Sequence, residues 1–183
     1  MVRAGDVIEN PVTGETMKFV LTGRETANEL LRIAMVVRPG GFVPAEHVHP
    51  RQEERFHVTD GRITLRVDGE ERVYAAGETI TIPPGTPHVW WNSGTGDLRV
   101  TLDFRPAGRF AEFITTFFAM AVAGKMNARG LPRDVVQMGV TLSEYRDVIQ
   151  GTTPPWTVQR VLFAAIEPIG RLFGYRPDVP YTA

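Results

Sequence analysis

Hydrophobic and polar residues alternate with a period of two along much of the first hundred residues. In "RITLRV" (residues 62–67) every second side chain is apolar, which is typical of a strand with one buried face and one face in water. Asp68 and Gly69 follow, a dipeptide that favours a tight turn with positive φ, and "ERVY" then returns. This part of the chain therefore predicts a β-hairpin.

Other short apolar segments occur on both sides of this hairpin. They are separated by Gly, Pro and Asn, and they read "TMKFVLTG", "ELLRIAMVV", "ETITIP" and "LRVTLDF". About seven or eight strands at this spacing predict a sandwich or a closed barrel in residues 1–105.

The period changes from two to that of a helix after "RPAG" (105–108). One apolar helix face follows and ends at Gly124; it consists of Phe110, Phe113, Ile114, Phe117 and Ala121. Residues 131–151, with a proline in the expected first turn, and residues 154–174 predict two more helices, the second kinked at Pro168. Residues 106–183 thus form a predicted helical extension.

These helices carry large apolar side chains that cannot all remain in water. The residues concerned are Phe110, Phe113, Phe117, Leu162, Ile166 and Leu172. We expect the extension to pack on the barrel or on the partner subunit of a homodimer.

Composition and charge narrow the classes of function. The 183 residues include 20 basic and 21 acidic side chains, for a net charge of −1, and no basic block indicates nucleic-acid binding. The absence of cysteine excludes disulfides, thiolate metal sites and cysteine nucleophiles. The longest apolar run, "VLFAAI" (161–166), is too short to cross a bilayer, and the N-terminus lacks a secretory signal. A cytoplasmic protein without membrane or nucleic-acid partners is expected.

Three of the four histidines lie between residues 47 and 61. In an extended segment His47 and His49 point to the same face, with Cα atoms about 6.6 Å apart, so both imidazoles can reach one cation. This spacing permits a metal site, but by itself it leaves an ordinary polar surface equally open.

The next strand adds a carboxylate to this pattern. Glu54 shares its face with Phe56 and Val58, so it points inward if these apolar residues do. A carboxylate in an apolar interior is costly unless it is paired or bound to a metal. By the same parity His57 points outward.

The fourth histidine follows a Pro-Pro-Gly turn in "GETITIPPGTPHVWWN". His88, Trp90 and Asn92 share one face of the strand after this turn. A single buried histidine is commonly a hydrogen-bonded core residue, so His88 becomes a candidate ligand only together with the first segment.

Both segments resemble the motifs of the cupin superfamily. "GFVPAEHVHPRQEERFHVTDG" is similar to the first cupin motif, G-x5-H-x-H-x4-E-x6-G, and "GETITIPPGTPHVWWN" to the second, G-x5-P-x-G-x2-H-x3-N. The ten matching positions, in chain order, are Gly41, His47, His49, Glu54, Gly61, Gly77, Pro83, Gly85, His88 and Asn92. The helical half resembles C-terminal extensions of some uncharacterised bacterial cupins.

The resemblance implies a mainly β fold, a cupin-type jelly-roll barrel (a double-stranded β-helix) followed by C-terminal α-helices. It assigns one divalent transition metal per chain to His47, His49, Glu54 and His88. Glu53 fits the motif spacing less well than Glu54, and His57 has no role in it. Iron, manganese, nickel, zinc, cobalt and copper all remain open.

The function that the resemblance implies is a metal-dependent enzyme acting on a small organic substrate, above all a dioxygenase or other oxidoreductase. The alternative is a non-catalytic small-molecule-binding cupin with a structural metal. An octahedral ion would keep two open positions for ligands, whereas a tetrahedral zinc ion would keep none.

Several side chains near the expected metal have two possible roles. Phe56 and Trp90 either wall a substrate pocket or pack in the core. Asn92 either bonds a ligand or terminates its strand, and Glu54 is both a metal ligand and a candidate proton acceptor.

Overall fold

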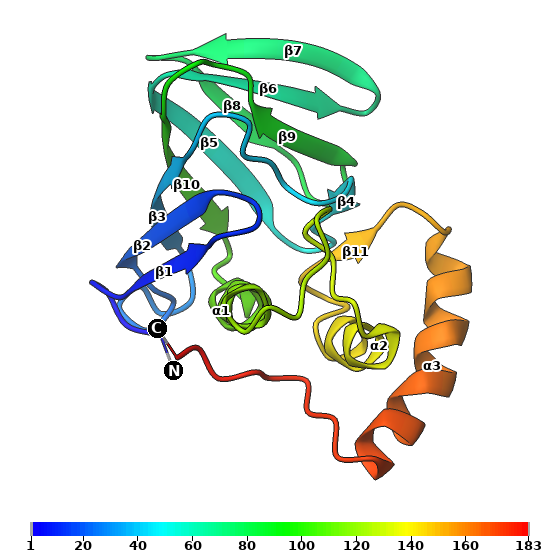
Figure 1. Cartoon of the computed structure of the whole chain (residues 1–183). Coiled ribbons are helices and arrows are strands. Elements are labelled where there is room, and N and C mark those ends of the chain that lie inside the picture. Colours follow the sequence, from blue (N-terminus) through cyan, green and yellow to red (C-terminus); the bar gives the residue numbers. More distant parts are fainter. Residues whose placement is uncertain (1, 183) are drawn as a thin grey trace.

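The computed structural model describes residues 2–182 and contains two antiparallel sheets followed by three helices (Figure 1). The six-stranded sheet has the order β1 (Val7–Asn10), β2 (Glu15–Leu21), β3 (Leu31–Val37), β10 (Leu98–Arg105), β5 (Glu53–Asp60) and β8 (Thr79–Ile82). The five-stranded sheet has the order β11 (Gln150–Gly151), β4 (His47–Val48), β9 (His88–Asn92), β6 (Arg62–Val67) and β7 (Glu70–Ala75). The predicted jelly-roll fold followed by helices is confirmed.

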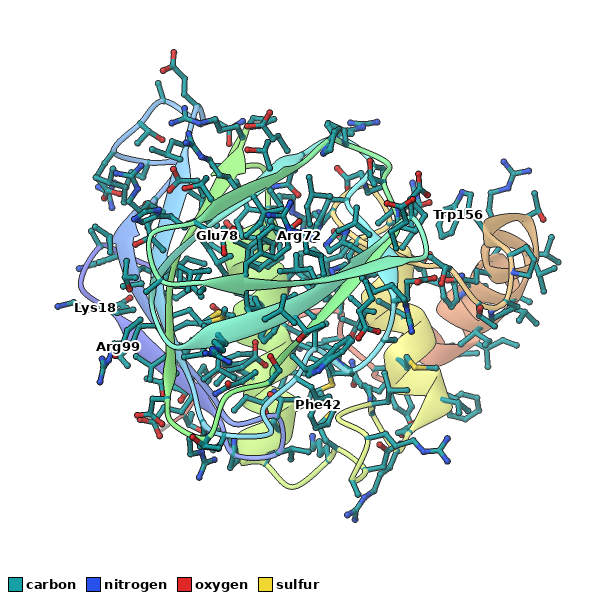
Figure 2. The ribbon with its side chains drawn as sticks, turned by 90° about the horizontal axis from the view of Figure 1, so that it is seen from above. Lys18, Phe42, Arg72, Glu78, Arg99 and Trp156 are labelled. Carbon is teal, nitrogen blue, oxygen red and sulfur yellow. The ribbon has the colours of Figure 1, made fainter. Side chains whose placement is uncertain are left out.

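Alternation of buried and exposed side chains on the strands explains the interior of the barrel. On β2, Met17 and Phe19 are buried while Lys18 between them is exposed, and on β10 exposed Arg99 separates two buried residues. Figure 2 shows Lys18 and Arg99 at the outer surface of the sheet. The apolar core therefore fills the space between the sheets.

The β6–β7 hairpin forms where the sequence predicts it. Its turn residues Asp68 and Gly69 have φ values of 52° and 84°, the left-handed region that a two-residue hairpin requires. This confirms the predicted turn.

The first helix, α1 (Phe110–Val122), packs against the barrel through its aromatic face. The ring of Phe110 stacks on Phe104 of β10 with centroids 3.8 Å apart, and Phe113 contacts Tyr145 at 5.6 Å. All four of these side chains are buried. α1 is therefore continuous with the barrel core.

The second helix, α2 (Val135–Glu144), is shorter than predicted, and a single helix over 131–151 is wrong. It begins after Asp134, whose side chain accepts hydrogen bonds from the backbone N–H groups of Val136 and Gln137. After the helix the chain turns and forms β11, in which Gly151 pairs with His47 of β4. The backbone groups of Gln150 and Gly151 thus pair with the edge of β4, whereas in a longer helix they would form hydrogen bonds within the helix.

The third helix, α3 (Trp156–Leu172), packs on α2 and lies away from the sheets (Figure 1). A Cβ atom on Gly170 would lie 2.5 Å from Val140, and one on Gly139 would lie 2.8 Å from Ile166, so glycine permits the close approach of the two helices. The opposite face of α3 is exposed in the single chain, and Leu172 is 83% exposed.

Within residues 2–182, no helix combines the length and the apolar character needed to cross a bilayer.

Candidate metal centre

Four buried side chains from three strands and one adjoining turn meet inside the barrel. Their potential ligand atoms all lie within 4.8 Å of one another, and the residues are His47, His49, Glu54 and His88. His47 of β4 lies directly opposite His88 of β9, and their ring centroids are 4.3 Å apart. The residues that the sequence predicted as metal ligands are therefore brought together at one point.

The orientation of each imidazole is fixed by a backbone carbonyl. Nδ1 of His47 lies 2.9 Å from the oxygen of Ala45, and Nδ1 of His88 lies 2.9 Å from the oxygen of Thr86. A carbonyl only accepts, so Nδ1 must carry the proton and donate it. Nε2 of each neutral ring then presents a lone pair to the centre, the form in which histidine binds metals.

The third imidazole is oriented by the helical extension. Nδ1 of His49 donates to the backbone oxygen of Val148, at 2.8 Å, and Val148 lies between α2 and β11. Sequence reasoning missed this contact because a backbone carbonyl can come from any residue. The extension therefore takes part in the site.

Unpartnered polar atoms at the centre fit a bound cation. Oε2 of Glu54 lies 2.8 Å from Nε2 of His88 and 3.5 Å from Nε2 of His49, but neither approach has hydrogen-bond geometry. These three buried atoms have no hydrogen-bond partner among the described residues. Lone pairs facing a carboxylate repel one another unless a proton or a metal ion lies between them.

The electrostatics of the cluster favour a neutral His47 and an ionised Glu54, the forms in which these two groups bind a metal. Burial, together with the imidazoles of His88 and His49, holds the pKa of His47 well below its ordinary value. Burial alone would raise the pKa of Glu54, but the neighbouring His49 and His88 outweigh it and hold that pKa well below the ordinary value. In turn, Glu54 outweighs the effect of burial on His88 and raises the pKa of that imidazole. Three imidazoles and a carboxylate fit one divalent transition-metal ion.

A large apolar cavity of about 410 Å³ opens beside the cluster. His47, His49 and Glu54 line it at one place, and the barrel and all three helices supply the rest of its wall. Apolar members of the wall include Met17, Trp90, Leu102, Phe113, Phe117, Met138, Leu142, Leu162, Phe163 and Ile166. A small organic molecule in this cavity would reach the ligand cluster.

The three predicted pocket residues have different places. Trp90 lines the cavity, while Phe56 is fully buried behind it, with ring centroids 6.4 Å apart. Asn92 is not among the lining residues; its amide donates to the backbone oxygens of Val37, Arg38 and Gly96. Asn92 therefore closes the turn after β9.

Residues outside the motif match the remaining sequence expectations. Glu53 is half-buried and stands outside the cluster. His57 is exposed, with its Nδ1 2.9 Å from the hydroxyl of Thr79 on the neighbouring strand.

A second buried carboxyl group, Glu15, also lines the cavity and was missed by sequence reasoning. Burial raises the pKa of Glu15 to about 7, and the hydrogen bond from Thr13, at 2.5 Å, opposes the shift only in part. The signal was present, because Glu15 shares its strand face with Met17 and Phe19, as Glu54 does with Phe56.

Comparison with known proteins places the barrel in a family. Residues 34–104 match the cupin domain family Cupin_2. Quercetin 2,3-dioxygenase of Bacillus subtilis is 30% identical over 88 residues, which cover 48% of this chain and 26% of that protein. The chain thus matches only about a quarter of that relative's length.

A second relative is similar beyond the barrel. A probable oxidoreductase of Hypocrea virens, virH, is 28% identical over 158 residues, covering 78% of this chain and 69% of that protein. A match to 78% of the chain necessarily includes part of the helical half.

A solved structure supports the fold alone. A predicted oxalate decarboxylase of Thermotoga maritima superposes with a TM-score of 0.51 at 21% identity, covering 58% of this chain and 98% of that one. The domain match at residues 34–104, both sequence motifs and the jelly-roll architecture agree, and the barrel of this chain is a cupin domain.

Proposed function

We propose that this chain is a metal-dependent cupin enzyme that oxidises a small, largely apolar organic substrate, with His47, His49, Glu54 and His88 holding one divalent transition metal. The observation that carries the proposal is that three of the four cluster residues, His47, His49 and Glu54, line the apolar cavity. A purely structural metal needs no such access, because its coordination is closed by the protein.

The chain's own residues supply position and environment for the reaction. The carbonyls of Ala45, Thr86 and Val148 fix the three imidazole rings, so their nitrogen atoms are arranged before a metal binds. The apolar wall excludes water and orients the substrate. A divalent metal bound here would supply Lewis-acid or oxygen-activating chemistry.

Glu54 has a second role in the proposal. Its Oε2 atom is buried between two imidazoles and borders the cavity, so it is placed to hold a proton removed from the substrate. Its low pKa keeps it ionised, the form that binds a metal, and makes it a weak base, so Glu54 would accept a proton only when displaced from the metal.

Metal analysis tests the ligand assignment. Wild-type protein purified without added metal should carry about one transition-metal ion per chain, and dialysis at low pH should release it because the ligands must be deprotonated. His49→Ala and His88→Ala should lose the ion on dialysis at neutral pH. His57→Ala, a histidine outside the cluster, is the matched control. Full occupancy in both ligand variants would overturn the assignment.

A spectroscopic experiment tests whether the metal is open to ligands. Cobalt-substituted protein should change its visible absorption on addition of azide, and an oxygen-electrode screen of small apolar compounds should then find one that is consumed. No azide response in a fully loaded sample would contradict the enzyme proposal.

The alternative function is binding of a small molecule without turnover. The scarcity of polar groups in the cavity wall favours it, because an apolar wall provides affinity but few groups for proton transfer. Saturable binding of a compound to the loaded protein, with no oxygen consumption and no product, would support this alternative.

A further inference from the structure

Glu15 stands apart from the metal centre within the same cavity. Phe104 of β10 pairs with both Glu54 and Leu31, whereas Glu15 pairs with Val37 at the other end of β3. Leu31 and Val37 lie six residues apart on β3. Inward-facing residues follow one another at every second position, about 6.8 Å apart along a strand, so three such intervals separate the two. The two carboxyl groups therefore border different ends of the cavity.

Polar side chains are unevenly distributed over the cavity wall. Among the described lining residues, Glu46 adjoins His47. Thr153 follows β11, the strand that pairs with His47, and Gln159 of α3 donates a hydrogen bond to the backbone oxygen of Gly151 in β11. These groups all belong to the metal end. Within the described part of the lining, Glu15 is the one carboxyl, hydroxyl or amide side chain outside that end.

The surroundings of Glu15 make its carboxyl group a hydrogen-bond donor. The side chain is 5% exposed, and Thr13 is its one side-chain hydrogen-bond partner among the described residues, donating to Oε2. On the sheet its neighbours are Asn10 and Val37, and the nearby Arg38 is exposed and directs its guanidinium to the oxygen of Pro11. No cation therefore faces the group, and burial favours its neutral, protonated form.

We propose that the cavity takes an elongated, mostly apolar ligand whose end remote from the metal centre carries an uncharged hydrogen-bond acceptor, such as a ketone, bound by the carboxylic acid of Glu15. The inference deepens the proposed function, because it names the class of substrate for the same cavity. An apolar ligand would displace water from Glu15 and favour the neutral acid further. Glu15 would then set specificity without touching the metal.

Pairs of synthetic probes test this inference on the metal-loaded protein. Each pair consists of linear alkyl hydroxamic acids of equal length, one ending in a methyl ketone and the other in a plain alkyl group. The hydroxamate can bind the metal, and a series of lengths locates the best fit. Calorimetric titration gives the affinity ratio of ketone to alkyl probe, in which the pH dependence of metal binding cancels.

The variants separate Glu15 from the rest of the site. At pH 6 the wild type should prefer the ketone about fivefold, the effect of one uncharged hydrogen bond, and the preference should be smaller at pH 9, above the pKa that Glu15 has in the ligand-free cavity. Glu15→Gln keeps a donor that does not ionise, so its preference should persist at both pH values. Glu15→Leu should bind the two probes equally while retaining its metal.

Two results would overturn the inference. One is an equal affinity of the wild type for both probes at every length, including the case in which neither binds. The other is a ketone preference that survives in Glu15→Leu. The proposed function fails separately, through metal analysis and the azide experiment, neither of which involves Glu15.

Discussion

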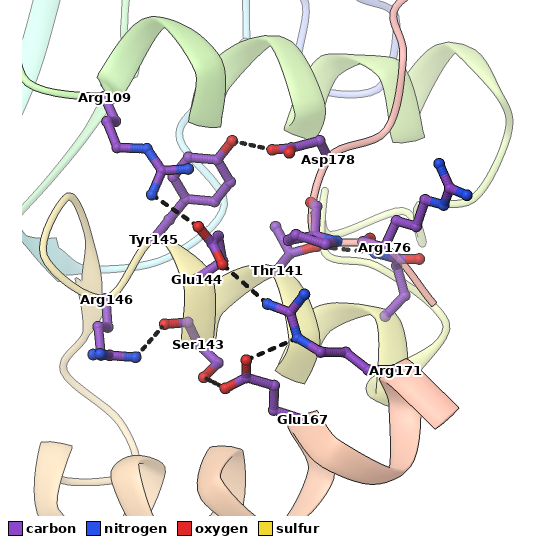
Figure 3. A network of polar contacts seen from close by, with 12 residues as sticks. Arg109, Thr141, Ser143, Glu144, Tyr145, Arg146, Glu167, Arg171, Arg176 and Asp178 are labelled. Atoms are coloured by element: carbon purple, nitrogen blue, oxygen red, sulfur yellow. Dashed lines mark hydrogen bonds and ion pairs between the residues drawn. The ribbon is translucent and has the colours of Figure 1, made fainter. Parts of the chain in front are cut away.

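The barrel and the helical half place their charged residues in different environments. In the barrel, Glu15 and Glu54 are buried and face the interior. In the helical half, Glu144, Glu167 and Arg171 form a partly exposed network that joins α2 to α3 (Figure 3). Desolvation magnifies the interactions of a buried charge, whereas water screens those of an exposed one. Chemistry is therefore expected in the barrel, and packing in the helices.

Apolar side chains show a related difference. α1 completes the barrel core, but α3 lines the cavity with one face and exposes another to solvent. Figure 2 places Trp156, at the start of α3, at the outer edge of the molecule. In the helical half, α1 thus belongs to the barrel core and α3 closes the cavity. Removing α1 should therefore affect the stability of the barrel, whereas altering α3 should affect the cavity.

The largest effect is expected from truncation after Arg105. It removes Phe110, Phe113 and Tyr145 from the core, each worth about 1.5–3 kcal/mol of burial, against a typical net stability of about 5–15 kcal/mol. It also removes the Val148 carbonyl that orients His49. The truncated chain should aggregate or lose its metal, as measured by light scattering and elemental analysis.

A second truncation, after Thr152, sharpens this prediction. It keeps α1, Val148 and β11 and removes α3, so metal binding should persist.

Light scattering of the full chain also tests the predicted homodimer. A folded, metal-loaded product of the Arg105 truncation, with unchanged assembly, would show that the extension is dispensable.

The next effect concerns the buried carboxyl group of Glu15. Its pKa is about 7 in the folded chain and 4.5 when unperturbed, so between these values the folded state holds a proton that the unfolded state has lost. The contribution of Glu15 to stability therefore falls as the pH rises from 4.5 to 7. From pH 5 to pH 8, the wild type should lose about 2–3 kcal/mol relative to Glu15→Gln.

Urea unfolding of the metal-free proteins at both pH values measures this difference. Glu70→Gln, at an exposed site on β7, is the matched control and should show no such dependence. If the free energy of unfolding changed equally with pH in wild type and in Glu15→Gln, the pKa of Glu15 would be the same in the folded and unfolded chains, which would contradict the prediction.

A smaller effect is expected at the contact between α2 and α3. In Gly170→Ala the new Cβ atom would lie 2.5 Å from Val140, so α3 must move outward, at a cost of about 1–3 kcal/mol. Gly96→Ala adds the same atom in open space and is the control. Probe affinity should fall in Gly170→Ala because α3 lines the cavity, while metal content should stay unchanged. Loss of metal would show that α3 supports the centre as well.

Local patterns account for what the sequence could predict. The alternation on β6 and the Asp68–Gly69 turn depend on neighbouring residues alone, and the spacing of the cupin motifs predicted the convergence of four ligand side chains. The end of α2 could not be predicted in this way, because β4 competes for the backbone of Gln150 and Gly151.

The cavity was beyond prediction for a related reason. Its wall combines residues from β2, β9 and all three helices, and no local pattern shows which of these elements meet. Glu15 could have been found by the parity that identified Glu54, but its neighbours contain no ligand motif. The strand pattern predicts that the Glu15 side chain points inward, but it does not predict which group the side chain would bind.

The smallest effect is expected from Arg171→Ala, which removes two ion pairs of the helical network. Arg171 contacts Glu167 at 2.9 Å and Glu144 at 3.0 Å, and its side chain is 45% exposed. Glu144 keeps its pair with Arg109, and Glu167 still accepts a hydrogen bond from Ser143. Water screens the lost pairs, and the freed side chain regains conformational entropy, so the urea midpoint should stay within experimental error at low and high salt. A marked decrease at low salt alone would mean that charges, rather than the glycine contacts, hold α3 against α2.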